Sequence, residues 1–322
     1  MHRNLNILML GGAKRVAMAE QLIRAGKLLG INVTIFSHEL SAQEPIASIG
    51  TVIVGSKYCN PNIDAEIDDI VAKHSIHVVL PFIDPGIEVA ARLAARNHDV
   101  FVPVSSIDVS HAMFDKAQAA DLFATAGIQI PLTYSADNIS YPAILKPRTG
   151  SASRGIIVAT KPADVEAAPL PLSDYLIQQY IGNKEEYTID CYVGMYDSEV
   201  KCAVPRLRIA TAGGEVIRTI TCRNAALEKQ AHQVLKALHL KGAVTLQFLH
   251  DLTTDRFLLM EINPRLGGGV ICSICAGADI ASMIIEESVD INARPRHDWR
   301  NGTLMTRYFK EVIFFNDDQN NE

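Results

Sequence analysis

The sequence predicts an α/β chain in two parts, a doubly wound parallel-sheet domain followed by an α+β region. Up to residue 105, short apolar runs alternate with helix-compatible segments, which is typical of βαβ units. Beyond it, apolar and polar residues alternate between Gly, Asp and Ser turns, which indicates an antiparallel meander. The 322 residues exceed one ordinary domain, and the 48% that are hydrophobic can build a sizeable core.

The first part, residues 1–105, contains five candidate strands separated by helical segments. They lie at 5–10, 31–36, 51–54, 77–82 and 100–104. The pair Gly11–Gly12 ends the first strand, and a polar helix is expected near 62–74. Asp84 is expected to cap the next helix, with Pro85 at its first position.

The second part opens with one amphipathic helix over residues 108–127, which Gly127 closes. A strand, a glycine-rich loop and another strand follow, and then the meander. The remaining expected elements are a helix at 225–239, strands at 243–251 and 255–263, and helices near 269–289.

Composition narrows the partners and the compartment. The 30 Lys and Arg against 36 Asp and Glu give a net charge of −6, without a basic run, so neither nucleic acid nor a membrane is expected as a partner. The six cysteines are scattered in apolar segments, and the pair Cys272 and Cys275 lacks a second pair or a suitably spaced His. The apolar stretch at the N-terminus is too short for a signal peptide. We expect a soluble, cytoplasmic protein.

A hairpin near the C-terminus gathers oxygen-bearing side chains. Strand alternation places Glu261 and Asn263 on one face. A turn about Thr254 places Gln247 opposite Glu261 in an antiparallel pair. Carboxylate and amide oxygens suit Mg²⁺ or Mn²⁺, and the absence of His and Cys argues against zinc. The alternative is a polar sheet edge that faces solvent.

Cations and glycines accompany this hairpin. Arg265 and Gly267–Gly269 follow it directly, and such a segment can bind an anion through backbone N–H groups and a fixed charge. Earlier, Lys146 ends a buried strand before the loop 149–155, which is rich in Gly, Ser, Thr and Arg. Such a loop can fold over phosphates, although similar loops are common turns. Lys116, taken alone, fits an ordinary solvated lysine.

In this order, the motifs resemble the ATP-grasp superfamily, most closely its members similar to the large subunit of carbamoyl-phosphate synthase. The resemblance covers roughly residues 110–310, and residues 1–105 are similar to the domain that precedes the fold in these proteins. It implies an ATP-grasp lid subdomain at 106–181, a C-terminal subdomain with the metal site at 182–310, and a tail at 311–322.

The resemblance also implies roles for individual residues. The hinge at Gln179 would meet adenine, Glu186 would bind ribose, and many relatives carry Glu where this chain has Gln178 or Gln179. The implied ATP contacts are Lys116, Lys146, Gly150, Ser151, Ser153, Gly155, Gln179, Tyr180, Ile181 and Glu186. Two magnesium ions, or manganese, would bind Gln247, Glu261 and Asn263. The implied catalytic residues are Arg265, Lys146 and Arg208.

These roles imply an ATP- and magnesium-dependent ligase that activates a small carboxylate as an acyl phosphate and joins it to an amine. A carboxylate or carbamate kinase-like phosphotransferase and a non-catalytic nucleotide-binding subunit stay open as alternatives. Arg206 and Arg208 are spaced to share a strand face, where they could hold a carboxylate or simply cover the sheet. The turn Gly11–Gly12 is another candidate anion site, and a homodimer is the expectation from the family. The sequence identifies neither the acid nor the amine.

Overall fold

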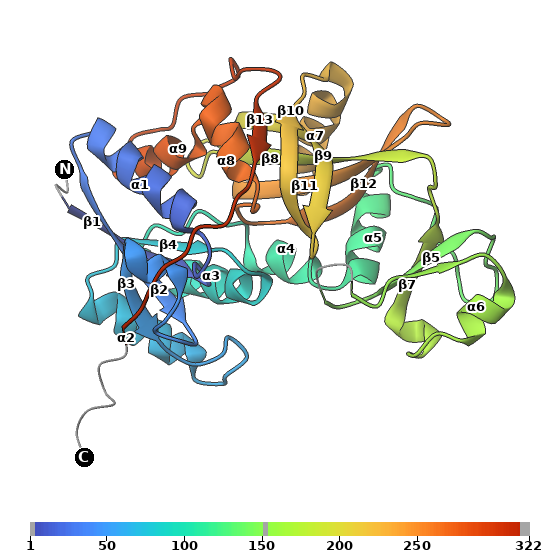
Figure 1. The fold of residues 1–322 in the computed structure, drawn as a ribbon, viewed down its shortest axis with the longest axis horizontal. Helices are drawn as coiled ribbons and strands as arrows, with labels where there is room; N and C mark the ends of the chain where they lie inside the picture. Colours follow the sequence, from blue (N-terminus) through green and yellow to red (C-terminus); the bar gives the residue numbers. More distant parts are fainter. Residues whose placement is uncertain (1–3, 151–153, 316–322) are drawn as a thin grey trace. The chain divides into compact units, whose positions relative to one another are not determined.

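The computed structural model describes residues 4–150 and 154–315 and divides into two compact units (Figure 1). Unit 1 comprises Met1–Val102 and Arg307–Glu322, and unit 2 comprises Pro103–Thr306. The sequence placed the first boundary at residue 105. Both parts of the expected ATP-grasp region fall in unit 2 except for residues 307–310, which belong to unit 1, and their functional division stays a proposal.

Unit 1 is built on a parallel four-stranded sheet in the order β3-β2-β1-β4. The strands are β1 (Asn4–Leu10), β2 (Asn32–Glu39), β3 (Thr51–Val54) and β4 (Val78–Pro81). The helices are α1 (Val16–Leu28), α2 (Ile63–Lys73) and α3 (Asp84–Arg96), with a 3₁₀ turn η1 (Pro45–Ser48). The central strand β1 is buried without a polar break from Ile7 to Leu10, as expected for a strand inside a parallel sheet.

Two predictions for unit 1 are wrong in detail. The expected strand at 100–104 is reduced to a single bridge between Phe101 and Val78, because Pro103 has no N–H with which to extend the ladder. Asp84 is not a helix cap, since α3 begins at Asp84 itself and the capping position is Ile83, which makes no side-chain capping bond.

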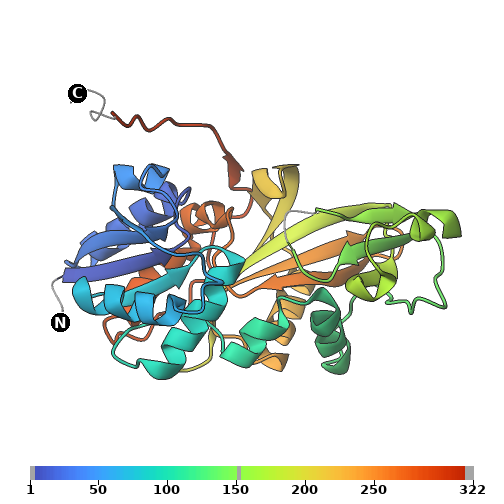
Figure 2. The same ribbon diagram turned by 90° about the horizontal axis from the view of Figure 1, so that it is seen from below.

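Unit 2 contains two antiparallel sheets (Figure 2). The small sheet has the order β6-β5-β7, with β5 (Ala143–Pro147), β6 (Ile157–Ala159) and β7 (Tyr175–Gln179). The large sheet has the order β12-β11-β8-β9-β10-β13. Its strands are β8 (Lys184–Val193), β9 (Val200–Ala212), β10 (Glu215–Thr221), β11 (Gly242–Asp251), β12 (Arg256–Asn263) and β13 (Leu304–Thr306).

The helical segments of unit 2 are mostly short. They are α4 (Ile107–Ala112), α5 (Lys116–Thr125), α6 (Pro162–Glu166), η2 (Leu172–Asp174), α7 (Ala225–Ala237), α8 (Val270–Ser273), the π-helical turn η3 (Ile274–Ala278) and α9 (Ile280–Glu287). The single helix predicted over 108–127 is therefore wrong. Asp115 adopts an extended conformation and its side chain accepts hydrogen bonds from the amides of Ala117 and Gln118, so a second helix begins there. Gly127 follows the end of α5 with φ +71°, as predicted.

One face of the large sheet is covered by α5 and α7. Phe123 of α5 and Leu227, Val234 and Leu235 of α7 pack in one buried cluster with inward residues of the strands such as Ile189. Because side chains alternate along a strand, the residues between these inward positions point to the opposite face. That second face carries the polar side chains described below.

Two further observations concern the whole chain. Within residues 4–150 and 154–315, none of the helices is long and apolar enough to cross a membrane. Cys272 and Cys275 are free thiols, one buried and one exposed, and Cys272 Sγ donates to the carbonyl of Thr303.

Candidate functional site

The face of the large sheet that points away from α5 and α7 carries most of the residues that the sequence singled out. On β8, the inward Tyr187 and Ile189 alternate with Glu186, Thr188 and Asp190. The same alternation holds on the neighbouring strands. The polar residues that it places on this face are Arg206 and Arg208 of β9, Thr245 and Gln247 of β11, and Glu261 and Asn263 of β12.

The β11–β12 hairpin pairs Gln247 with Glu261, as predicted. The turn end of the ladder pairs Asp251 with Arg256, and a register shift next to Gln247 leaves Met260 as an extra residue. A regular ladder from that turn would pair Gln247 with Met260, so the bulge is what brings Glu261 opposite Gln247. Bulges that re-aim side chains are common beside active sites.

Two of the candidate metal ligands, Glu261 and Asn263, are joined by a hydrogen bond, and Gln247 is the ladder partner of Glu261. Asn263 Nδ2 donates to Glu261 Oε1 at 3.0 Å, and Arg265 Nη2 lies 3.4 Å from Asn263 Oδ1. Gln247 and Glu261 are half-buried, while Asn263 is buried. One carboxylate and two amide oxygens fit Mg²⁺, which commonly takes one or two carboxylates and completes its shell with phosphate oxygens and water. No group of three His, Cys, Asp or Glu suited to a metal occurs in the described part of the chain.

Lys146 is buried, with 7% of its surface exposed, and its ammonium donates to Gln178 Oε1 at 3.0 Å. Burial lowers the pKa of Lys146 to about 8, with Lys184 and Lys116 adding to the shift and Glu261 and Glu186 opposing it. Gln178 was not predicted as the partner of this lysine. The ladder pairs Lys146 with Leu176 of β7, so Gln178 is its diagonal neighbour on the same face.

The structure also brings Lys116 to the glycine loop. Its Nζ donates to the carbonyl of Gly150 at 2.7 Å, and α5 begins at this lysine. Gly150 and Gly155 have φ of +106° and +71°, a region that favours glycine. Ser151 and Ser153 lie outside the described residues.

The hinge after β7 supplies an apolar surface. Ile181 packs in a buried cluster with Leu249 and Leu258, and Met260 lies against it. The backbone N–H of Gln179 donates to the carbonyl of Leu132 at 2.8 Å, so this backbone donor is already engaged. Lys184 Nζ lies 5.2 Å from the ring centroid of Tyr180.

Arg208 and Glu186 lie together on the polar face. Arg208 Nε is 3.5 Å from Glu186 Oε2, and Arg208 Nη1 is 3.4 Å from Thr188 Oγ1. Burial lowers the pKa of Arg208, and the carboxylates of Glu186 and Glu261 oppose that shift. Arg208 Nε is buried beside the Glu186 carboxylate without a hydrogen bond of its own, and Arg208 Nη2 donates to the carbonyl of Gly214 at 3.2 Å.

Arg206 has a different role from Arg208. It is 1% exposed and binds Asp190 through Nε to Oδ2 at 2.7 Å and Nη2 to Oδ1 at 3.1 Å. Ser273 Oγ donates to the same carboxylate at 2.6 Å. The suggestion that both arginines hold a substrate carboxylate is therefore wrong for Arg206, whose charge is satisfied inside the protein.

The buried ion pair of Arg206 and Asp190 also explains why a glycine occupies position 269. A Cβ on Gly269 would lie 2.6 Å from Arg206 Nη1, and a Cβ on Gly267 would lie 2.9 Å from Thr245 Oγ1. These glycines are needed for close packing against the polar core. The sequence suggested only that they approach an anion.

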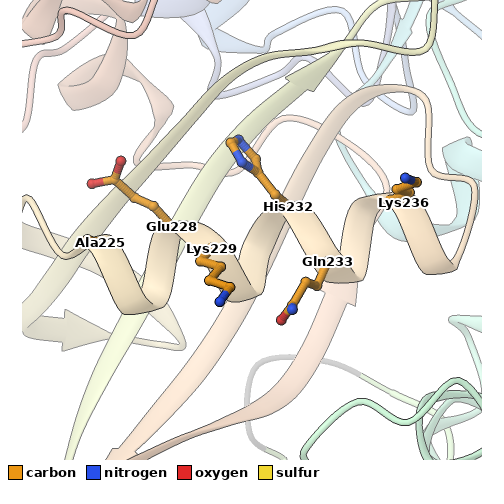
Figure 3. Close-up of a pocket in the computed structure, with 6 residues that line it drawn as sticks. All are labelled: Ala225, Glu228, Lys229, His232, Gln233 and Lys236. Atoms are coloured by element: carbon orange, nitrogen blue, oxygen red, sulfur yellow. The ribbon is translucent and has the colours of Figure 1, made fainter.

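A surface hollow of about 440 Å³ lies on the exposed side of α7 (Figure 3). Its lining residues are Ala225, Glu228, Lys229, His232, Gln233 and Lys236. Since α7 packs on the core face of the sheet, this hollow is separate from the polar face. It contains none of the residues that the sequence singled out.

Comparison with known proteins agrees with this geometry. Residues 172–310 match the family model described as "ATP-grasp in the biosynthetic pathway with Ter operon". The chain is 26% identical over 294 residues to the α subunit of mitochondrial methylcrotonoyl-CoA carboxylase from Glycine max, a match that covers 79% of this chain and 39% of that protein. The chain thus spans well under half of this curated relative.

Two solved structures illustrate the fold. The biotin carboxylase domain of Hydrogenobacter thermophilus 2-oxoglutarate carboxylase, solved as a dimer with MgADP, ADP and bicarbonate, superposes with a TM-score of 0.73 at 18% identity, covering 93% of this chain and 73% of that one. The L-amino acid ligase of Bacillus licheniformis gives 0.70 at 16% identity, covering 91% and 76%. These likenesses establish the fold of the chain.

Proposed function

We propose that this chain, which has the ATP-grasp fold, is an ATP- and magnesium-dependent ligase. It would activate a small carboxylate as an acyl phosphate and join it to an amine, releasing ADP and phosphate. The observation that carries the proposal is that Lys146 of the small sheet and Arg208 of the large sheet both interact electrostatically with the carboxylates of Glu186 and Glu261 on the polar face. The matched family model and the fold that the chain shares with an L-amino acid ligase support the same reaction class.

The residues of the chain would divide the work by position. Lys116 and Lys146 would neutralise the phosphates, while the cluster around Ile181 would pack against the base and Glu186 would accept the ribose hydroxyls. Arg208 would orient the substrate carboxylate, because its guanidinium lies on the polar face beside Glu186 and within the electrostatic reach of Glu261.

Near the reacting phosphorus, Arg265 would stabilise the charge on the transferred group. Gln247, Glu261 and Asn263 would hold the metal. Bound Mg²⁺ would supply charge neutralisation at the β- and γ-phosphates. The mechanism requires no nucleophile from the protein, and none of the candidate site residues is a cysteine.

An ATPase assay tests the reaction class. ADP and phosphate are measured with Mg²⁺ against a panel of amino acids, small carboxylates and amines. Dependence on both an acid and an amine supports the ligase, whereas ADP release with one acid alone indicates a phosphotransferase. Tight ATP binding without turnover under any pairing would reject both enzymatic functions.

Replacing a metal ligand tests the site. Glu261→Ala is expected to lower turnover at least about a hundredfold with the fold intact, because it removes the only carboxylate of the set. Glu166→Ala, at an exposed position of α6 in the same unit, is the matched control and should keep wild-type turnover. Unchanged activity in Glu261→Ala would refute the metal assignment.

Three further expectations concern the winding of unit 1, the oligomeric state and the location of the protein. We infer that unit 1 is doubly wound, because right-handed crossovers place α1 on one face of its sheet and α2 and α3 on the other. A homodimer is proposed by analogy with the dimeric biotin carboxylase domain, and light scattering of the purified protein tests it. A cytoplasmic location stays a prediction from composition.

A further inference from the structure

Asp115 and Arg148 form an ion pair that the proposed reaction does not yet use. Arg148 Nη2 donates to Asp115 Oδ2 at 2.5 Å, and Arg148 Nε lies 3.1 Å and 3.0 Å from the two carboxylate oxygens. Asp115 Oδ1 also accepts hydrogen bonds from the amides of Ala117 and Gln118. The carboxylate is thus both the N-cap of α5 and the partner of a guanidinium on another element.

Backbone hydrogen bonds reinforce the same junction. The Lys116 amide donates to the carbonyl of Arg148 at 2.9 Å, and the Arg148 amide donates to the carbonyl of Asp174 at 2.9 Å. Arg148 directly follows β5, whose last residues include Lys146. These bonds therefore join the start of α5 to the end of β5. The joined residues, Asp115 and Arg148, lie one position from Lys116 and two positions from Lys146 in the sequence.

The two lysines at this junction act on each other. The ammonium of Lys116 contributes to lowering the pKa of Lys146, so the two like charges are close enough to repel. Lys116 Nζ donates to the carbonyl of Gly150, at the start of the glycine loop. The repulsion between the two cations has an electrostatic cost, and a bound polyanion would offset it.

We propose that Asp115 and Arg148 are positioning residues that hold Lys116 and Lys146 as one binding unit for the polyphosphate of a magnesium nucleoside triphosphate. The inference rests on the proposed function. It predicts that Arg148 acts through Lys116 and contacts no phosphate itself, because its guanidinium is occupied by Asp115 and by the carbonyl of Ser173 at 3.4 Å.

Two substitutions separate pairing from folding. Asp115→Asn keeps an N-cap, since Asn caps helices as well as Asp does, but removes the charge that Arg148 pairs with. Arg148→Met removes the guanidinium, and Arg148→Lys restores the charge without the planar fork. The matched control is Arg92→Met, which breaks a similarly exposed ion pair with Asp64 in unit 1.

Isothermal titration of the full chain with MgATP is the measurement, with thermal unfolding recorded for every variant. Asp115→Asn and Arg148→Met are each expected to weaken MgATP binding about fivefold, a loss in keeping with a partly exposed pair. Arg148→Lys should recover part of the loss, and Arg92→Met should bind as the wild type does.

A double-mutant cycle gives the decisive readout. If Arg148 acts by holding the two lysines together, Arg148→Met should add a clearly smaller loss in a Lys116→Met background than in the wild type, whereas a general structural defect would add its full loss in both backgrounds. Unchanged affinity in Arg148→Met, or additive losses, would overturn the inference while leaving the ligase proposal intact. If the wild-type chain itself fails to bind MgATP, the proposed function fails and this inference fails with it.

Discussion

Lys146 is the residue at which burial and charge are most finely balanced. Its ammonium is nearly enclosed, and its hydrogen-bond partner is Gln178, a neutral amide that is itself buried. A neutral partner satisfies the donor without compensating for the lost hydration, so burial lowers the pKa of Lys146 to about 8. Glu261 and Glu186 face the ammonium from β12 and β8 and limit the shift, while Lys184 and Lys116 increase it.

This balance predicts a pH dependence of nucleotide affinity. The folded pKa is lowered, so the positive charge of Lys146 is present below about pH 8 and is lost as the pH rises through that value. We therefore expect MgATP binding to weaken above about pH 8. Gln178→Glu places a carboxylate beside the ammonium, which favours the charged form and should move the alkaline limb to higher pH by about one unit or more.

Titration calorimetry with MgATP at several pH values between neutral and strongly alkaline measures the alkaline limb of the wild type and that of Gln178→Glu. The Gln233→Glu variant is the matched control, because that side chain lies on the exposed side of α7, away from the polar face that carries the candidate site. Coincident alkaline limbs in the wild type and in Gln178→Glu would contradict the explanation.

Among the elements, the segment after β12 depends most on the core beneath it. Gly269 has no room for a side chain, because a Cβ would lie 2.6 Å from Arg206 Nη1 and 2.7 Å from Val216 Cγ1. Arg206 cannot simply move aside, since its guanidinium is buried and paired with Asp190. The shape of this segment, which begins directly after Arg265, is therefore linked to a buried ion pair on β8 and β9.

Gly269→Ala should destabilise the protein by about 1–3 kcal/mol, the usual cost of overpacking a closed site. Gly182→Ala is the control, because a Cβ there would meet only Tyr180 Cε1, at the ordinary contact distance of 3.6 Å. Urea unfolding of the three proteins gives the comparison. Equal stability of the two variants would show that the segment around Gly269 can shift to accept a Cβ and would contradict this prediction.

The alternation of apolar and polar residues was sufficient to predict several strands and to place the candidate metal ligands on one face of the large sheet. Alternation placed Glu261 beside Asn263, and the hairpin placed Gln247 opposite Glu261, although the actual register depends on the bulge at Met260. A bulge leaves no clear mark in a sequence. The break between α4 and α5 was missed because Asp115 lies within an otherwise continuous amphipathic pattern, and its capping role is evident only from its hydrogen bonds.

At the scale of the molecule, the features that sequence reasoning missed are contacts between distant positions. Ser273 binds Asp190 across 83 positions, and Lys146 binds Gln178 across 32. No periodicity connects such residues, because their proximity comes from the order of strands in the sheets. The same limitation explains why the spacing of Arg206 and Arg208 on one strand left open whether they bind a carboxylate or cover the sheet, whereas the structure gives Arg206 a buried partner, Asp190.

All of the described candidate contacts for the nucleotide belong to unit 2, and this leads to a prediction for the whole chain. Binding of MgATP should slow amide hydrogen exchange in β5, in the hinge after β7 and in β12, since ligand contacts suppress local opening there. The strands β1 and β4 of unit 1 should exchange at unchanged rates. Exchange measured by mass spectrometry on the full chain tests this, with Lys146→Met as the control that should show no protection. Protection confined to unit 1 would place the nucleotide elsewhere and would remove the basis for assigning the polar face of the large sheet as the site of phosphoryl transfer.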